Sequence, residues 1–355
     1  MAIRIGLINT YSTLNIGDAA IYSALASLVD PAEVVAKVQD VEPLPVPGVS
    51  FPAELGSCDA LISVGGDIFN NGREWLITRT FLQNLRELNR DPQHTVLFGQ
   101  SIPRSCHGLS FHALVLCLKR LAGVCVRDAE SHRRLCQAGV KAILSYDAAF
   151  ALTLHPRAEA EASRLLRDAG IEPSRAALLS VRGFDRMYAH NSAKFQDQLV
   201  DLSHSLLGQG LQPVILIQSR AYGADNDLEV AEALTRRVPR LASFNPFHGG
   251  SGLAGWQLVM GALKVASLSV AVRYHTAVLA LAAGRVPFNL HYSNKGRDLS
   301  ERLGVIGCGL ESFEPSTQLE AILASGKRRF NDGEIRRQVR QDLRQCLDPV
   351  LEGRW

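Results

Sequence analysis

Short apolar runs rich in β-branched residues alternate with longer segments of helical periodicity along almost the whole chain. This alternation is typical of parallel sheets that carry helices on both faces, so the pattern predicts an α/β protein. In the first half the predicted strands are Ile3–Ile8, Ala60–Val64, Thr95–Phe98, Val124–Val126 and Ala142–Leu144, and the predicted helices are Asp18–Leu28, Trp75–Leu88, His112–Leu121 and Asp128–Ala138. In the second half the predicted strands are Ala177–Val181, Pro213–Ile217, Leu241–Ser243, Leu268–Val272 and Val286–His291, and the predicted helices include Lys194–Leu207, Asp227–Arg237 and Ala277–Ala283.

A polar helix separates these two halves. His155-Pro156 precedes the helical segment Arg157–Ala169, which ends before Gly170. Helix starts and stops of this kind mark a boundary near the end of the first half. We therefore predict two Rossmann-like domains, residues 1–152 and 153–330, followed by a charged C-terminal helix within residues 331–355.

Composition excludes several classes of protein. The 355 residues are 46% hydrophobic and 21% charged, which is an ordinary globular composition and excludes a disordered or fibrous chain. The net charge of +3 is too small and too evenly spread for a nucleic-acid-binding tail. The longest apolar stretches are shorter than the roughly 20 residues that a membrane span needs, and the start MAIRIGLIN lacks the layout of a signal peptide. We expect a soluble, cytoplasmic protein that binds no nucleic acid.

The seven cysteines are odd in number and form no CxxC pair. Most of them lie in apolar segments, which favours reduced core residues over disulfides or zinc ligands.

Polar residues gather where the predicted strands end. In parallel sheets the ligand lies outside the carboxyl ends of the strands, so these positions are the candidate site. In the first half they are Asn15, Gly17, Asp18, Gly65, Gly66, Asp67, Gln100 and Arg127, and in the second half Arg182, Arg273, His275 and Lys295. Many have a structural interpretation as well, because Asp18 suits a helix N-cap and Gly65-Gly66 suits a tight turn. Arg273, His275 and Lys295 are harder to explain in that way, since three basic groups at one edge can converge on one anion.

Several familiar catalytic motifs are missing. The segment Gly6–Gly17 contains neither GxGxxG nor GxxxxGK[ST], which disfavours NAD and P-loop chemistry. The sequence also lacks a GxSxG elbow, an HExxH helix and carboxylates at metal-ligand spacing, which argues against serine hydrolases and metalloenzymes.

The ordered segments NIGDAAI, DALISVGGDIF, LFGQSIP, VRDAESHRRL, SYDAAF, LSVRGF, VRYHTAVLALAAGRVP and HYSNKGRD resemble the polysaccharide pyruvyl transferase family. The resemblance spans roughly residues 5 to 305. It implies two Rossmann-like domains that face each other across a cleft, as in GT-B glycosyltransferases. It also implies an activity, the transfer of pyruvate from phosphoenolpyruvate to two hydroxyls of a sugar to form a ketal in polysaccharide biosynthesis.

The resemblance also implies roles for individual residues. Position by position, it implies that Arg127, His275 and Lys295 are catalytic and that Arg273 binds substrate. We add Arg182, Asn15, Gly17, Asp18, Gly65, Gly66, Asp67 and Gln100 as substrate-binding candidates because of their places at the strand ends. Asp67, Ala19 and the GQSIPR run depart from the family's pattern, all in the N-terminal domain where the acceptor should bind. The departures therefore affect the identity of the acceptor more than that of the donor.

The proposed donor explains why several cations would be needed. Phosphoenolpyruvate carries a carboxylate and a phosphate on a small carbon frame, and guanidinium and ammonium groups match these oxyanions. Ketal formation also needs a proton on the methylene carbon, for which His275 is the best donor. We expect the donor at the strand ends of the second domain, with Arg127 reaching it from the first, and we expect no metal or cofactor.

Two alternatives remain open. A GT-B glycosyltransferase could use the same cations on the diphosphate of a nucleotide sugar, and a non-catalytic protein of this fold could use them only to bind an anion. The acceptor could be nucleotide-linked or lipid-linked, and a lipid-linked acceptor would bring the protein into peripheral contact with a membrane.

Overall fold

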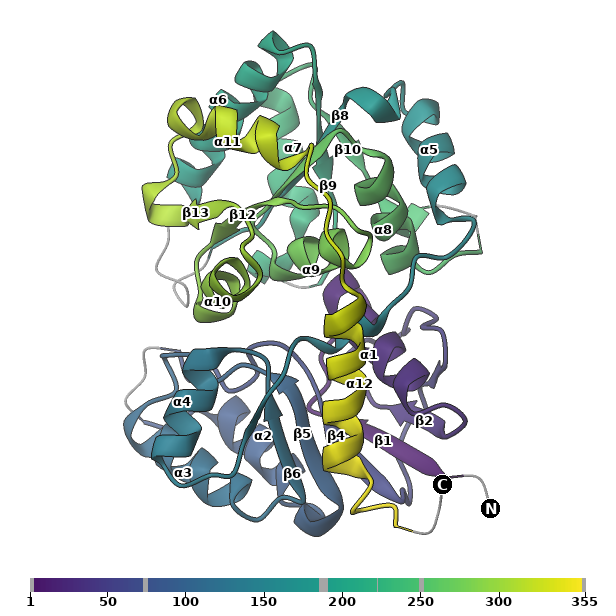
Figure 1. The fold of residues 1–355 in the computed structure, drawn as a ribbon, viewed down its shortest axis with the longest axis vertical. Helices are drawn as coiled ribbons and strands as arrows, with labels where there is room; N and C mark the ends of the chain where they lie inside the picture. Colours follow the sequence, from purple (N-terminus) through teal and green to yellow (C-terminus); the bar gives the residue numbers. More distant parts are fainter. Residues whose placement is uncertain (1–2, 73–75, 185–190, 222, 249–251, 353–355) are drawn as a thin grey trace. The chain divides into compact units, whose positions relative to one another are not determined.

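The computed structural model describes residues 3–352 except 73–75, 185–190, 222 and 249–251, and its strands and helices alternate as the sequence pattern predicts (Figure 1). The chain divides into two units. The first comprises Met1–Thr13, Asp18–Leu152 and Gly333–Trp355, and the second comprises Leu14–Gly17 and Thr153–Asp332. The chain thus passes into the second unit after Leu152, while two segments depart from the expected limits. Residues 14–17 group with the second unit, and the C-terminal helix groups with the first.

The first unit is built on a parallel sheet with the strand order β3-β2-β1-β4-β5-β6-β7. Its strands are β1 (Arg4–Ile8), β2 (Glu33–Ala36), β3 (Val49–Ser50), β4 (Ala60–Ser63), β5 (Thr95–Gln100), β6 (Gly123–Val126) and β7 (Ile143–Leu144). β4 and β5 are buried along their whole length, as expected for strands covered on both faces. After β1 the next strands, β2 and β3, are added on one side of it, whereas β4 and the strands after it are added on the other side. A ligand crevice is expected where the strand order reverses, at the carboxyl ends of β1 and β4.

Helices cover both faces of this sheet. They are α1 (Ile16–Leu28), α2 (Arg79–Leu88), α3 (Gly108–Leu118), α4 (Ala129–Gln137) and α12 (Gly333–Leu347). Val124 and Val126 of β6 belong to one core with apolar residues of α2, α3 and α4. Cys125, between these valines, points to the other face, where it interacts with Cys346 of α12. In Figure 1, α12 is the yellow helix that lies along the strands of the first unit. α12 and α2–α4 therefore lie on opposite faces of the sheet.

The second unit repeats the design with the strand order β10-β9-β8-β11-β12-β13. Its strands are β8 (Ala176–Ser180), β9 (Gln212–Leu216), β10 (Ala242–Phe244), β11 (Leu268–Ala271), β12 (Phe288–His291) and β13 (Gly307–Gly309). Its helices are α5 (Ala158–Asp168), α6 (Ser192–Gly208), α7 (Asp227–Arg237), α8 (Gly255–Val265), α9 (Tyr274–Ala282), α10 (Asn294–Leu303) and α11 (Pro315–Ser325). The chain reverses its direction of winding between β8 and β11, which places the ligand crevice of this sheet at their carboxyl ends.

The predicted strands are present with small shifts at their ends, and several further elements were not predicted. Trp75, the predicted start of one helix, lies outside the described residues, and α2 begins at Arg79. β3 has only two residues, too few for a pattern. α8 is buried over most of its surface, so no polar stripe marks it as a helix. The seven cysteines are free thiols, as expected, but Cys136 is exposed and does not belong to the core.

Candidate functional site

A network of buried polar side chains lies at the carboxyl edge of the first sheet. Gln100, at the end of β5, donates from Nε2 to the carbonyl of Val64 at 2.7 Å and to the hydroxyl of Ser63 at 3.1 Å. Asn9, which follows β1, donates to the same hydroxyl at 2.9 Å. Oε1 of Gln100 and Oδ1 of Asn9 are buried and have no hydrogen-bond partner among the described residues. The ends of three neighbouring strands are thereby tied together, with two acceptor atoms left over.

The turn after β4 requires glycine at its first position. Gly65 has φ +116°, and a β-carbon there would lie 2.9 Å from the carbonyl oxygen of Asn9. The next residue, Gly66, lies beside the guanidinium of Arg127, since a β-carbon at residue 66 would be 3.9 Å from Nη2. The two glycines therefore let the backbone approach both β1 and Arg127 closely.

Arg127 follows β6 and is only 2% exposed. Nη1 donates to Oδ2 of Asp147 at 2.5 Å, and Nε donates to the hydroxyl of Ser101 at 3.0 Å. Asp147 also accepts the backbone N–H of Ala149 at 2.9 Å, which fixes the carboxylate in place. The pair is fully buried, so the orientation of Arg127 depends on Asp147.

Two other candidates of the first unit lie near this edge. Asp18 is buried in the first turn of α1, and burial of Tyr22, together with the charge of Asp18, raises the pKa of Tyr22. Asp67 follows Gly66, and its carbonyl accepts the N–H of Asn70 at 2.9 Å. Neither contact assigns a substrate role, so their roles remain predictions.

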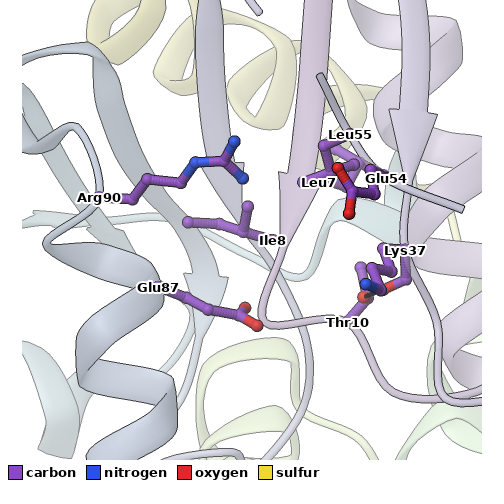
Figure 2. A pocket seen from close by; sticks show the side chains of 8 residues that line it. All are labelled: Leu7, Ile8, Thr10, Lys37, Glu54, Leu55, Glu87 and Arg90. Carbon is purple, nitrogen blue, oxygen red and sulfur yellow. Dashed lines mark hydrogen bonds between the residues drawn. The ribbon is translucent and has the colours of Figure 1, made fainter. Parts of the chain in front are cut away.

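A cavity of about 340 Å³ opens on the first unit next to β1. Figure 2 shows Glu87 and Arg90 reaching toward Ile8 from the α2 side, with Lys37 and Glu54 on the opposite side. Leu7, Thr10 and Leu55 complete its lining. Glu87 also accepts the N–H of Asn9 at 2.6 Å, which links the cavity to the polar network of the sheet edge. Two carboxylates and two cations around an apolar floor suit a ligand that has both hydroxyl and anionic groups.

In the second unit, Arg273 is held between two carboxylates. Its Nε and Nη2 donate to Asp227, at distances of 2.5 to 3.1 Å, and its Nη1 donates to Oδ1 of Asp225 at 2.8 Å. Nε also reaches the carbonyl of Val181, at the end of β8, at 3.0 Å. The guanidinium thus uses most of its donors on the protein and fixes the start of α9 to the α7 loop.

These charges stabilise one another. Burial alone would raise the pKa of Asp225, but Arg273 and Arg182 beside it hold that pKa below the ordinary value. Burial likewise opposes the charged form of Arg273, yet Asp227 and Asp225 raise its pKa above that of a free arginine. Asp225 and Arg273 are therefore both charged throughout the physiological pH range.

Arg182, which follows β8, joins the same cluster. Its Nη1 donates to the hydroxyl of Tyr292 at 2.5 Å, and Nη2 lies 3.8 Å from Oδ1 of Asp225. The guanidinium carbon lies 5.4 Å from the centre of the Tyr292 ring. Tyr292 follows β12, so Arg182 links the ends of β8 and β12.

The segment Leu14–Gly17 brings His275 into this cluster. Asn15 donates to Oδ2 of Asp225 at 3.0 Å and accepts the N–H of Gly17 at 2.9 Å. The N–H of Ile16 donates to the carbonyl of Gln218, after β9, at 2.8 Å. Gly17 then packs directly against the imidazole, because a β-carbon at residue 17 would lie 2.6 Å from Cγ of His275 and closer still to Nδ1. Glycine is the only residue that fits there without moving the ring.

Tyr274 connects His275 with Lys295. Its ring centre lies 5.3 Å from that of His275, and Nζ of Lys295 lies 5.5 Å from it. His275 is partly exposed at the start of α9, and Lys295 is 7% exposed at the start of α10. Tyr274 therefore lies beside each of the two basic groups that the RYH and YSNK segments predict.

Sequence reasoning identified the cations and missed their partners. Asp147, Asp225, Asp227, Tyr274 and Tyr292 were not among the candidates. Asp147 stands in the SYDAAF segment, which offered a signal, whereas Asp225 lies in the turn before α7 and Asp227 is the first residue of that helix, and neither belongs to a recognisable motif. Within the part of the chain that the structure describes, no three His, Cys, Asp or Glu side chains gather as metal ligands. In the same part of the chain, no helix has the length and apolar character needed to span a membrane.

Comparison with known proteins decides the family. The model of the polysaccharide pyruvyl transferase family matches residues 15–294. The chain belongs to this family. The match begins at Asn15 and includes Arg127, Arg182, Arg273 and His275, so it covers residues of both sheet edges. No curated protein sequence matches the chain.

Solved structures support the fold of this family member. UDP-GlcNAc 2-epimerase from Methanocaldococcus jannaschii, in complex with UDP-GlcNAc and UDP, has a TM-score of 0.60 at 11% identity, over 97% of this chain and 100% of the other. UDP-N-acetylglucosamine 2-epimerase from Rickettsia bellii has a TM-score of 0.59 at 10% identity and covers 100% of both chains. Sucrose-phosphate synthase from Thermosynechococcus elongatus has a TM-score of 0.51 at 13% identity, over 98% and 94%. The expected class, two Rossmann-like α/β domains of GT-B type, is confirmed.

Proposed function

We propose that this pyruvyl transferase moves the pyruvyl group of phosphoenolpyruvate onto two hydroxyls of a sugar, forms a ketal and releases phosphate. The observation that carries the proposal is that His275 and Lys295 both lie beside the ring of Tyr274, at the strand ends of the second unit. An acid and a cation within reach of one small ligand are what this reaction needs.

Charge determines the binding of the donor. Arg273 is engaged with Asp225 and Asp227, so its main task is to position the start of α9. Lys295 and Arg182 then neutralise the phosphate and the carboxylate of the donor. Both come from strand ends of the same sheet, and Tyr292 keeps Arg182 in position through its hydroxyl.

His275 supplies the proton. Transfer of a proton to the methylene carbon of phosphoenolpyruvate makes its C2 electrophilic, and a sugar hydroxyl forms a new C–O bond there and gives up its own proton. The bond between C2 and the bridging oxygen of the phosphate breaks with release of inorganic phosphate, and a second hydroxyl bonds to C2 and gives up its proton, which closes the ketal. Phosphoenolpyruvate and a diol thus yield the ketal and phosphate, and no oxidant or reductant is required.

The acceptor is assigned to the first unit. Glu54 and Glu87 of its cavity suit sugar hydroxyls, while Lys37 and Arg90 suit an anionic carrier such as a phosphate. We expect Glu54→Gln, at an exposed position, to raise the KM for the acceptor and to leave the KM for phosphoenolpyruvate unchanged. An increase in both constants would argue against a separate acceptor site.

The direct test is an assay of the purified protein with phosphoenolpyruvate and a panel of nucleotide-linked and lipid-linked sugars. We expect phosphate release that depends on both substrates, together with a product heavier than the acceptor by one pyruvate less water. Release of a nucleotide from a nucleotide sugar, without consumption of phosphoenolpyruvate, would instead identify a glycosyltransferase. Binding of phosphoenolpyruvate without turnover of any acceptor would favour an anion-binding protein.

A further inference from the structure

Helix α3 has an unusual composition for a helix on the surface. Its sequence, GLSFHALVLCL, contains no Asp, Glu, Lys or Arg, and its polar side chains are the buried Ser110 and the exposed His112. A surface helix normally has an apolar stripe toward the core and polar residues elsewhere. α3 buries Leu114, Val115 and Leu118, yet Leu109 is 60% exposed and Leu116 is 54% exposed. The core therefore does not explain the apolar outer face of this helix.

The neighbouring helix extends this apolar face. Of the six exposed large hydrophobic residues in the described part of the chain, four lie in residues 76–116: Leu76, Leu82, Leu109 and Leu116. α2 and α3 bury their inner faces in the same core, so their outer faces point to the same side of the sheet. Exposed apolar side chains on two helices that are in contact mark an interaction surface more often than single scattered ones do.

Exposed cations stand on α2 and in the segments next to α3. Arg79 and Arg86 are exposed on α2, Arg104 precedes α3, and Lys119 and Arg120 follow it. The two carboxylates described between residues 76 and 120 have partners within the protein. Glu87 accepts the N–H of Asn9, and Asp91 pairs with His94. The outer face of α2 and α3, called the α2–α3 face below, thus carries exposed leucines together with exposed cations, and His112 lies between Leu109 and Leu116 on α3.

We propose that the α2–α3 face binds the surface of a membrane that contains anionic lipids. Leucine side chains at such a surface enter the boundary between headgroups and acyl chains, and arginine and lysine pair with the headgroup phosphates. A second copy of this chain is a poor occupant, because a two-fold contact would set the same cations against each other. Nucleic acid would satisfy the cations and leave the leucines in water.

This location also fits the acceptor. Glu87 of α2 and Arg90 line the proposed acceptor cavity, and Leu82 and Arg86 of the same helix lie on the α2–α3 face. A sugar on a lipid carrier would therefore be presented beside the surface that holds the protein. Presentation of the acceptor at this surface rests on the proposed function, whereas binding to the membrane does not.

The test is co-sedimentation of the full chain with vesicles of phosphatidylcholine alone or with added phosphatidylglycerol. We expect binding to the anionic vesicles, weaker binding at high salt, and little binding to the neutral ones. The variant Leu109→Ser/Leu116→Ser should bind about tenfold more weakly, a loss of about 1.4 kcal/mol, because less apolar surface leaves water on binding. The variant Arg86→Gln/Lys119→Gln/Arg120→Gln should bind on the order of 100-fold more weakly, at about 1 kcal/mol per cation.

A charge-matched control comes from α12, on the other face of the sheet. Arg337, Arg340 and Arg344 are exposed there, and Arg337→Gln/Arg340→Gln/Arg344→Gln should bind as the wild type does. Equal weakening by this control, or no binding of the wild type to anionic vesicles, overturns the proposal. So does a wild-type dimer that the leucine variant converts to a monomer in analytical ultracentrifugation, because the face would then bind a second copy.

Two further measurements keep the outcomes separate. Thermal unfolding of each variant shows whether it is folded. If the leucine variant is not folded, the vesicle binding of the cation variant tests the proposal. Turnover of phosphoenolpyruvate with a water-soluble acceptor should be the same in the wild type and in both variants of the face. Absence of turnover in all of them contradicts the proposed function and leaves the result of the vesicle experiment standing.

Discussion

Gly17 and His275 are in direct contact, and there is no room for a side chain between them. A β-carbon at residue 17 would lie 2.6 Å from Cγ and 2.9 Å from Cε1 of the imidazole. Asn15 holds the glycine by accepting its N–H and is itself bound to Asp225. The position of the proposed acid therefore depends on a segment that lies far from it in the chain.

We expect Gly17→Ala to displace the imidazole and to lower kcat about 10²- to 10⁴-fold, as the loss of a general acid does. Steady-state kinetics should show this loss with a folded protein and a nearly unchanged KM for phosphoenolpyruvate. The matched control is Gly208→Ala, where a β-carbon would meet nothing within 4 Å, and its activity should equal that of the wild type. Wild-type kcat in the Gly17 variant would contradict the positioning role.

Removal of the imidazole should separate binding from turnover. We expect His275→Ala to lose about 10²- to 10⁴-fold in kcat while phosphoenolpyruvate still binds, measured by calorimetry, because Lys295 and Arg182 remain. His204→Ala, at an exposed position on α6, is the control. A variant that turns over at the wild-type rate would remove His275 from the mechanism.

The buried pair Arg127–Asp147 should be essential for stability. Asp147→Asn leaves a buried guanidinium without its counter-charge, and we expect the free energy of unfolding to fall by about 3–5 kcal/mol in urea titrations. Glu130→Gln breaks the exposed pair Glu130–Arg133 and should cost less than about 1 kcal/mol. Equal effects of the two substitutions would mean that burial adds nothing to the pair.

The lowered pKa of Asp225 predicts a pH dependence with a definite sign. Burial acts against the carboxylate, but Arg273 and Arg182 outweigh it, so the folded-state pKa lies below the unfolded-state value of about 3.9. The ionised group therefore stabilises the fold above that value, and this stabilisation is lost as the pH falls through the folded-state pKa. Asp225→Asn should lower the Tm at pH 7, and the difference from the wild type should narrow below about pH 4.

A control for this experiment is Asp168→Asn. Asp168 is 59% exposed in its pair with Arg164, and its loss should change the Tm little at any pH. A difference between Asp225→Asn and the wild type that stays constant from neutral to acid pH would show that the ionisation of Asp225 does not contribute.

The residues at the two sheet edges could be predicted from the sequence because each of them directly follows a strand in the chain. A buried strand followed by Arg127 or by Arg273 places that cation at the carboxyl edge whatever the rest of the chain does. Their partners could not be predicted in this way. Asp225 and Asp227 reach Arg273 only because β9 and β11 both flank β8, and such pairings are decided by the whole fold. The cations were therefore expected to meet an anionic ligand, whereas Arg273 meets two carboxylates of the protein.

The return of α12 to the first unit imposes an order on biosynthesis. Cys346 of α12 lies against Gly123 and Cys125 of β6, yet α12 follows the entire second unit in the chain. While the ribosome is still making the second unit, the face of β6 that α12 will cover is open to water. Domains commonly fold as units during synthesis, N-terminal ones first. Here the N-terminal unit acquires its last helix only after its successor has been made, so a nascent chain halted before Gly333 would expose an apolar sheet face to chaperones and to other nascent chains.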